Sequence, residues 1–198
     1  MKVKMLSFLC ILMLFSSPAF ATLIDFESVT PGSYTGSLTI GDATISTVSG
    51  TYVITPSLYG PAPWGGQSFL NIANDITTSV NIITFSSGIY VTDLALEAGD
   101  YNSDVDPIYL EAYDRYDNLV ASDTFLIPAP STAAHSLGVS ASDISYVKFW
   151  SGDPYSGSVY WDNIDYTAAP VPEPATMLLL GSGLLGLVGL GRKKLFRS

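Results

Sequence analysis

Short apolar runs that alternate with polar residues fill the middle of this chain, and clusters of Gly, Pro, Ser, Asn and Asp separate them. Alternation with a period of two predicts β-strands with one buried face, and no segment has the 3.6-residue apolar period of an amphipathic helix. Many short strands with turn signals between them are typical of an all-β sandwich or barrel. The expected strands are Leu23–Phe26, Leu38–Ile40, Ala43–Thr47, Tyr52–Thr55, Phe69–Ile72, Val80–Phe85, Val91–Glu97, Ile108–Tyr113, Leu119–Thr124, Ala134–Leu137, Tyr146–Trp150 and Val159–Tyr166.

Two of these runs also assign side chains to faces. In Ile108–Tyr113 the aliphatic residues share one parity and the Tyr and Glu residues share the other. In Tyr146–Trp150 the odd-numbered residues are expected to point inward, because alternate side chains lie on opposite faces of a strand. Trp150 and Trp161 are large apolar side chains on expected strands, and we expect both in the core.

Two segments between strands carry turn signals. Asp114–Asn118 is rich in Asp and Asn and predicts a hairpin turn, in which Asn118 is suited to a positive φ angle. Ser140–Ile144 is expected to form a single helical turn at most.

The first 21 residues have the three parts of a secretory signal peptide. A basic start with Lys2 and Lys4 precedes the apolar run Met5–Phe15 and a small-x-small cleavage site at Ala19–Ala21. The apolar run is short for a membrane span. Cleavage by signal peptidase is therefore expected to leave Thr22 as the first residue of the mature chain.

The composition of the middle of the chain restricts its partners. Between Thr22 and Thr167 only Arg115 and Lys148 are basic, against 17 acidic residues, which gives a formal charge of −15. Such a surface repels phosphates, so nucleic-acid binding is excluded; it attracts divalent cations or simply keeps the domain soluble. The only cysteine, Cys10, lies in the signal peptide, so the domain has neither a disulfide nor a thiolate metal site.

A Pro-Glu-Pro motif lies near the C-terminus, at Val171, Pro172, Glu173 and Pro174. The apolar stretch 175–190 follows, and a basic cluster comes directly after it. As a helix this stretch would cover about 24 Å, slightly less than a hydrocarbon core of about 30 Å. The basic cluster is expected to stay in the cytoplasm, which places the domain outside the inner membrane.

This order of motif, apolar helix and basic end resembles the PEP-CTERM sorting signal. The resemblance implies processing near the motif by an exosortase, an integral-membrane cysteine protease, in a host that exports extracellular polysaccharide. The alternative is an ordinary tail anchor with an incidental Pro-rich linker. The expected organisation is a signal peptide at 1–21, a β-sandwich domain at 22–167, and a sorting tail with one transmembrane helix at 168–198.

Three segments of the domain resemble the jelly-roll, galactose-binding-like sandwiches of carbohydrate-binding modules: the opening strand 24–27, the hairpin 110–114 with 117–120, and the closing strand 159–164. This resemblance implies two antiparallel sheets and a structural Ca²⁺ shared by the first and last strands. The equivalent ligands in this chain are Asp25, Glu27, Asp162 and Asn163. Carboxylate and amide oxygens are ligands that Ca²⁺ prefers, although the same residues also suit a solvated edge.

A second acidic segment, Asp100–Asp106, has the Asp-x-Asn-x-Asp spacing of an EF-hand loop. Val105 occupies the position where that loop needs Gly, and Pro107 follows. An irregular Ca²⁺ loop and a solvated loop both remain open for this segment.

Polysaccharide binding would need exposed aromatic rings that stack on sugar faces. The candidates are Trp64, Tyr59 and Tyr155, all in expected loops, where such rings also serve as local packing anchors.

Catalysis has little support in the residues. The domain has one histidine, His135, and lacks the Gly-x-Ser-x-Gly motif of an α/β-hydrolase nucleophile. Three functions follow in order of preference. The first is a non-catalytic surface or biofilm-matrix protein, the second a calcium-stabilised carbohydrate-binding module, and the third a small secreted hydrolase.

Overall fold

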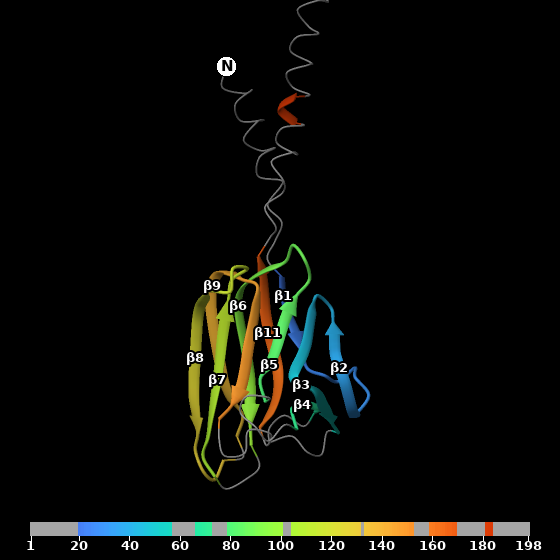
Figure 1. Cartoon of the computed structure of the whole chain (residues 1–198), viewed down its shortest axis with the longest axis vertical. Helices are drawn as coiled ribbons and strands as arrows, with labels where there is room; N and C mark the ends of the chain where they lie inside the picture. The colour runs from blue at the N-terminus through green and yellow to red at the C-terminus, as the bar shows by residue number, and fades with distance from the viewer. Residues whose placement is uncertain are drawn as a thin grey trace, which may run out of the picture.

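The computed structural model describes residues 20–56, 66–72, 79–100, 104–131, 133–152, 159–169 and 181–183. Within these residues the domain is all-β, as the alternating pattern predicts (Figure 1). Its strands are β1 (Phe20–Ile24), β2 (Gly32–Ile40), β3 (Ala43–Thr55), β4 (Ser68–Leu70), β5 (Asn81–Phe85), β6 (Tyr90–Gly99), β7 (Asp106–Tyr113), β8 (Leu119–Ile127), β9 (His135–Ile144), β10 (Tyr146–Ser151) and β11 (Tyr160–Ala169).

The 11 described strands form one continuous hydrogen-bonded sheet, and the long strand β3 is where it divides into two halves, called here the first and the second sheet. One edge of β3 pairs with β2, and its other edge pairs first with β5, through 43–47, and then with β4, through 53–55. From β5 the first sheet continues through β10 and β7 to β8. From β4 the second sheet continues through β11 and β6 to β9, and β1 also pairs with β11. The pairings between described strands are antiparallel.

Strands β8 and β9, at the far ends of the two sheets, lie against each other. The backbone N–H of Gly138 on β9 donates to Asp123 Oδ2 on β8 at 2.9 Å, which ties these ends together. The result is the expected two-sheet antiparallel β-sandwich (Figure 1).

Aromatic rings fill the centre of the sandwich. Phe69 on β4 packs against Tyr52, Phe26 and Phe149, with ring centroids 5.0, 5.9 and 6.4 Å apart. Phe149 in turn meets the edge of Trp161 at 4.9 Å. Trp161 is 1% exposed, so its predicted place in the core is confirmed. Together these rings join the two sheets, because β4 and β11 belong to one and β10 to the other.

Two local predictions were wrong. Ser140–Ile144 is part of β9 and pairs with β6 across a bulge, because its alternating side chains suit an edge strand better than a helical turn. In the hairpin between β7 and β8 the predicted turn is present, but Asp117 has the positive φ of 62°. Asp tolerates this left-handed conformation nearly as well as Asn.

The beginning of β1 and the end of β11 lie at the same end of the sandwich, where Phe20 pairs with Ala168 (Figure 1). β1 begins two residues before the predicted mature start at Thr22, so cleavage there would remove two of its five paired residues. In the part of the chain that the structure describes, residues 181–183 are helical and no helix is long and apolar enough to cross a membrane.

Candidate functional site

The residues predicted to form a shared site of the first and last strands lie where β11 changes its neighbour. One edge of β11 pairs with β4 at Tyr160 and Trp161, and with β1 only from Ile164 onward. Asp162 and Asn163 fall between these two pairings. Asp162 still pairs with Glu97 of β6, and the register shifts directly after it, as at a β-bulge.

The segment after β1 covers this gap. The carboxylate of Glu27 accepts a hydrogen bond at 2.6 Å from the backbone N–H of Gln67, and the Gln67 side-chain amide donates to the Glu27 carbonyl at 3.0 Å. The backbone N–H of Glu27 donates to Asp25 Oδ1 at 3.2 Å. Phe26 lies between Asp25 and Glu27 in the sequence, has a φ of 58° and is buried in the core. Its buried position fixes the backbone direction at both acidic neighbours.

Asp162 is the buried member of the cluster, with 3% of its surface exposed. Burial, together with the negative charges of Glu27, Asp25 and Glu97, raises the pKa of its carboxyl to about 7. Its Oδ1 is buried and has no hydrogen-bond partner among the described residues. An acceptor in this state costs free energy unless a proton or a cation meets it.

The charges of Asp25, Glu27 and Glu97 all act on Asp162, and Glu97 is a neighbour that sequence reasoning missed. Among the described residues, however, no three of these carboxylates have oxygens within 4.8 Å of one another, so the predicted ligand set stays a prediction. Glu97 is the direct partner of Asp162 in the β6–β11 pairing, so only the strand register could have identified it. The Asn163 side-chain amide donates a hydrogen bond from Nδ2 to Glu97 Oε2 at 2.8 Å, and Asn163 has a positive φ of 47°. Hard oxygen ligands of this kind fit Ca²⁺.

A strip of aromatic side chains lies on the outer face of the first sheet. Tyr109 on β7 stacks on its cross-strand partner Trp150 on β10, with ring centroids 5.1 Å apart and planes 15° apart. Four residues along, Tyr113 stacks on Tyr146 at 4.9 Å and 3°. All four rings are half-buried, whereas the residues that alternate with them on these strands are buried in the core.

Polar groups occupy the middle of this strip. Glu111 and Lys148 are cross-strand partners between the two ring pairs. The Lys148 ammonium lies 4.7 Å from the centre of the Tyr113 ring, a cation–π contact. The Tyr113 hydroxyl donates to Glu111, and burial together with this carboxylate raises the pKa of Tyr113 to about 12. The strip thus combines flat apolar rings with fixed hydrogen-bonding groups.

The prediction that Trp150 lies in the core was wrong, because Trp150 follows the outward parity of Tyr146 and Lys148. The alternation already contained this signal. The predicted loop aromatics Trp64, Tyr59 and Tyr155 lie outside the described residues.

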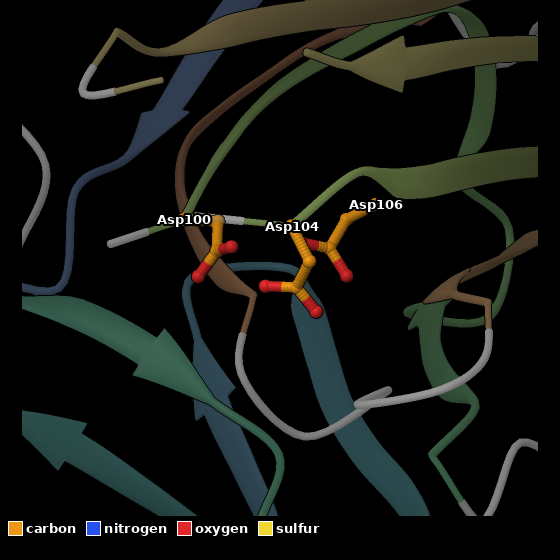
Figure 2. Close-up of side chains that lie close together, drawn as sticks. All are labelled: Asp100, Asp104 and Asp106. Atoms are coloured by element: carbon orange, nitrogen blue, oxygen red, sulfur yellow. The ribbon is translucent and has the colours of Figure 1, made fainter. Parts of the chain in front are cut away.

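A second carboxylate cluster links the ends of two strands. Figure 2 shows the side chains of Asp100, Asp104 and Asp106 close together. Asp100 directly follows β6, Asp104 lies two residues before β7, and Asp106 is the first residue of β7. One carboxylate oxygen from each lies within 4.8 Å of the others.

His135 begins β9 and has a packing role, as predicted. Its ring stacks on Phe125 with centroids 4.6 Å apart, and its Nε2 is 3.0 Å from Ser131 Oγ.

Residues 170–193 match the PEP-CTERM protein-sorting motif. The match includes the Val171–Pro174 tetrapeptide and identifies the chain as an exported protein that an exosortase processes. Apart from 181–183, the motif lies outside the described residues.

The β-sandwich is similar to solved structures of low sequence identity. A DUF4465 family protein from Bacteroides caccae has a TM-score of 0.50 and 10% identity, over 74% of this chain and 98% of that one. The CBM22-1–GH10 modules of a Clostridium thermocellum endo-1,4-β-D-xylanase, complexed with xylohexaose, have a TM-score of 0.42 and 11% identity, over 73% of this chain and 28% of that one. A CBM29-2 variant complexed with mannohexaose has a TM-score of 0.36 and 10% identity, over 77% of this chain and 94% of that one.

At 10% identity the similarity to the DUF4465 family protein supports the β-sandwich fold alone. No curated protein matches the chain in sequence.

Proposed function

We propose that this exported protein is a non-catalytic component of the cell surface or extracellular matrix, and that its sandwich binds polysaccharide through the outer face of β7 and β10. The observation that carries the proposal is the strip of two stacked ring pairs on that face. Aromatic rings present flat apolar surfaces, which pack against the C–H faces of sugar rings. Processing by an exosortase supports delivery to the surface, where such polymers occur.

The polar groups between the ring pairs supply the second requirement of a sugar site. Glu111 accepts hydrogen bonds and Lys148 donates them, and both are held by their contacts with Tyr113. A ligand site of this kind combines apolar walls with a few fixed polar groups that set orientation. Hydroxyl groups on successive sugars would meet these two side chains while the rings on either side carry the stacking.

The charge of the domain narrows the class of polymer. With only two basic residues against 17 acidic ones between Thr22 and Thr167, the domain repels polyanions at low ionic strength. We therefore favour a neutral polysaccharide over an acidic one. Biofilm matrix is the setting that this proposal implies.

We also propose a structural Ca²⁺ at Asp25, Glu27, Asp162 and Asn163, with Glu97 as an additional neighbour. The buried, unpartnered Oδ1 of Asp162 supports this site, because a cation there would satisfy it. The ion would fasten the segment after β1 to the bulge in β11. Calcium in this role stabilises the sandwich and takes no part in a reaction.

Affinity electrophoresis of the full-length chain in gels that contain neutral or acidic polysaccharides tests the binding. We expect retardation by at least one neutral polymer and a loss of about tenfold in affinity, or ~1.4 kcal/mol, in Trp150→Ala. Tyr116→Ala is the matched control, because Tyr116 is an exposed ring (76%) in the turn beyond the strip. Equal retardation of wild type and Trp150→Ala, or no retardation by any polymer, would contradict the proposal.

A further inference from the structure

The carboxylates of Asp100, Asp104 and Asp106 form a cluster separate from the one at Asp162. Three oxygens, one from each residue, lie within 4.8 Å of one another (Figure 2). Two ligands on opposite sides of a Ca²⁺ ion are about 5 Å apart at most, since each Ca–O bond is about 2.3–2.6 Å. The separation therefore matches what one ion can bridge.

Asp106 supplies an independent sign of a missing ligand. Its side chain is fully buried (0% exposed), and neither of its carboxylate oxygens has a hydrogen-bond partner in the described part of the chain. A buried carboxylate is normally paired, hydrogen-bonded or bound to a metal. Its neighbours in the cluster are the acids Asp100 and Asp104, and a hydrogen bond between Asp106 and Asp100 requires that the two carboxyl groups share a proton.

Positive side chains do not compensate this cluster. The domain between Thr22 and Thr167 has only two basic residues, Arg115 and Lys148. Arg115 pairs with Asp143 at 2.7 Å, and the Lys148 ammonium lies over the Tyr113 ring. Neither of these side chains is therefore available to pair with Asp106, whose buried carboxylate needs a proton or a bound cation because uncompensated charge at such a place is costly.

The position of the cluster in the fold suggests what an ion would do there. Asp100 follows the last residue of β6, which belongs to the second sheet. Asp106 begins β7 in the first sheet, where it pairs with Ile127 of β8. The chain crosses from one sheet to the other between these residues, so one ion would hold both sheets at the crossing.

We propose that Asp100, Asp104 and Asp106 bind a Ca²⁺ ion that fastens the crossing from β6 to β7. The site is distinct from the one proposed around Asp162, so the chain would bind two ions. Ca²⁺ is preferred over transition metals because all three ligands are carboxylates and none is His or Cys.

Calorimetric titration of the EDTA-stripped, full-length chain with CaCl₂ at pH 8 tests this site. Asp162→Asn isolates the Asp106 cluster, and we expect it to retain one binding event. Adding Asp106→Asn should weaken that event by about tenfold or more, because one of three carboxylate charges is lost. Asn has the shape of Asp without its charge, and Asp104→Asn, at a half-buried position, is a milder second variant.

The matched control is Asp165→Asn, an exposed acid on β11, which should leave both binding events unchanged. If Asp162→Asn keeps a wild-type far-UV spectrum but binds no Ca²⁺ at millimolar concentration, the proposal is wrong. It is also wrong if adding Asp106→Asn or Asp104→Asn leaves both the affinity and the stoichiometry of Asp162→Asn unchanged, whatever either substitution does to stability. If wild type and Asp162→Asn each bind one ion with the same affinity, and Asp106→Asn weakens that binding, the Asp106 site stands and the Asp162 site is wrong.

Discussion

Trp150 on β10 stacks on Tyr109 of β7 at 5.1 Å, and the pair rests beside a glycine that leaves no room for a side chain. A Cβ atom on Gly152 would lie 2.6 Å from Pro107 Cγ and 3.4 Å from Tyr109 Cε2. The backbone N–H of Gly152 donates to the Pro107 carbonyl at 2.7 Å, which holds the two strands at this spacing. The absence of a side chain at this position is therefore part of how the outer strip is built.

Gly152→Ala should move Pro107 and with it Tyr109, because backbone-linked ring atoms cannot shift away cheaply. We expect a loss of about 1–3 kcal/mol in the free energy of unfolding, as for other overpacked sites. Urea denaturation measures this loss, and a changed near-UV spectrum would report the disturbed Tyr109–Trp150 pair. Gly138→Ala is the matched control, since its Cβ would meet only the Leu94 carbonyl at an ordinary 3.8 Å. Equal stability of the two variants would contradict the close packing at Gly152.

The two buried aspartates give the metal-free protein a distinctive dependence on pH. In the folded state the pKa of Asp106 and that of Asp162 are both raised from 3.8 to about 7, mainly by burial. Between these values the unfolded chain releases protons that the folded chain keeps, so stability falls as pH rises from about 4 to about 7. Each carboxyl contributes roughly 2–4 kcal/mol to this fall.

Thermal melts in EDTA between pH 4 and pH 8 measure this effect. The Asp106→Asn and Asp162→Asn variants should each flatten the dependence, because the amide does not titrate. Added Ca²⁺ should restore stability above pH 7, where both carboxylates are ionised and available as ligands. A wild-type protein whose melting temperature rises from pH 4 to pH 7 in EDTA would contradict the assignment of raised pKa values.

Much of the fold could be predicted from the sequence because the physics of a strand is local. Alternating parity identified most strands, and correctly applied it also places Trp150 outside. Trp161 was placed in the core by its size alone, and there it is buried. The error at Trp150 came from judging residue type ahead of position. Size and hydrophobicity suggest the core, but on a strand the neighbours at i±1 decide the face.

The site residues that sequence reasoning missed depend on pairing between distant strands. Glu97 joins Asp162 through the register of β6 with β11, and local sequence contains no record of that register. Local sequence also did not predict that the expected strands 43–47 and 52–55 form one long strand, β3, which pairs with β5 and then with β4 along one edge. By contrast, Asp25 and Asp162 were found through a resemblance that covers both ends of the domain.

The turn between β7 and β8 depends on one side chain. Asp114 Oδ1 accepts hydrogen bonds from the backbone N–H groups of Tyr116 and Asn118 at 2.8 and 2.9 Å, and its Oδ2 accepts from Asn118 Nδ2 at 2.9 Å. The bonds from Asn118 lower the pKa of Asp114. Asp114→Ala should therefore lower the urea midpoint. Asp114→Asn keeps an acceptor oxygen, so its urea midpoint should lie between those of wild type and Asp114→Ala. A midpoint for Asp114→Ala equal to that of wild type would show that the turn does not need this side chain.

Calcium should stabilise the sandwich through Asp162. An ion that binds only the folded chain stabilises it by about 2.7 kcal/mol when present at about 100 times its dissociation constant. We expect the melting temperature of wild type at pH 8 to rise from EDTA to excess CaCl₂, and the rise to shrink in Asp162→Asn and in Asp25→Ala. In EDTA, Asp162→Asn should be at least as stable as wild type, because a buried negative charge beside Glu27 and Glu97 is removed. This opposite pair of effects distinguishes a ligand from a merely structural residue, whose loss would lower both melts. If calcium leaves the wild-type melt unchanged, the Asp162 cluster is not a stabilising metal site, and the negative charges there are balanced by protons alone.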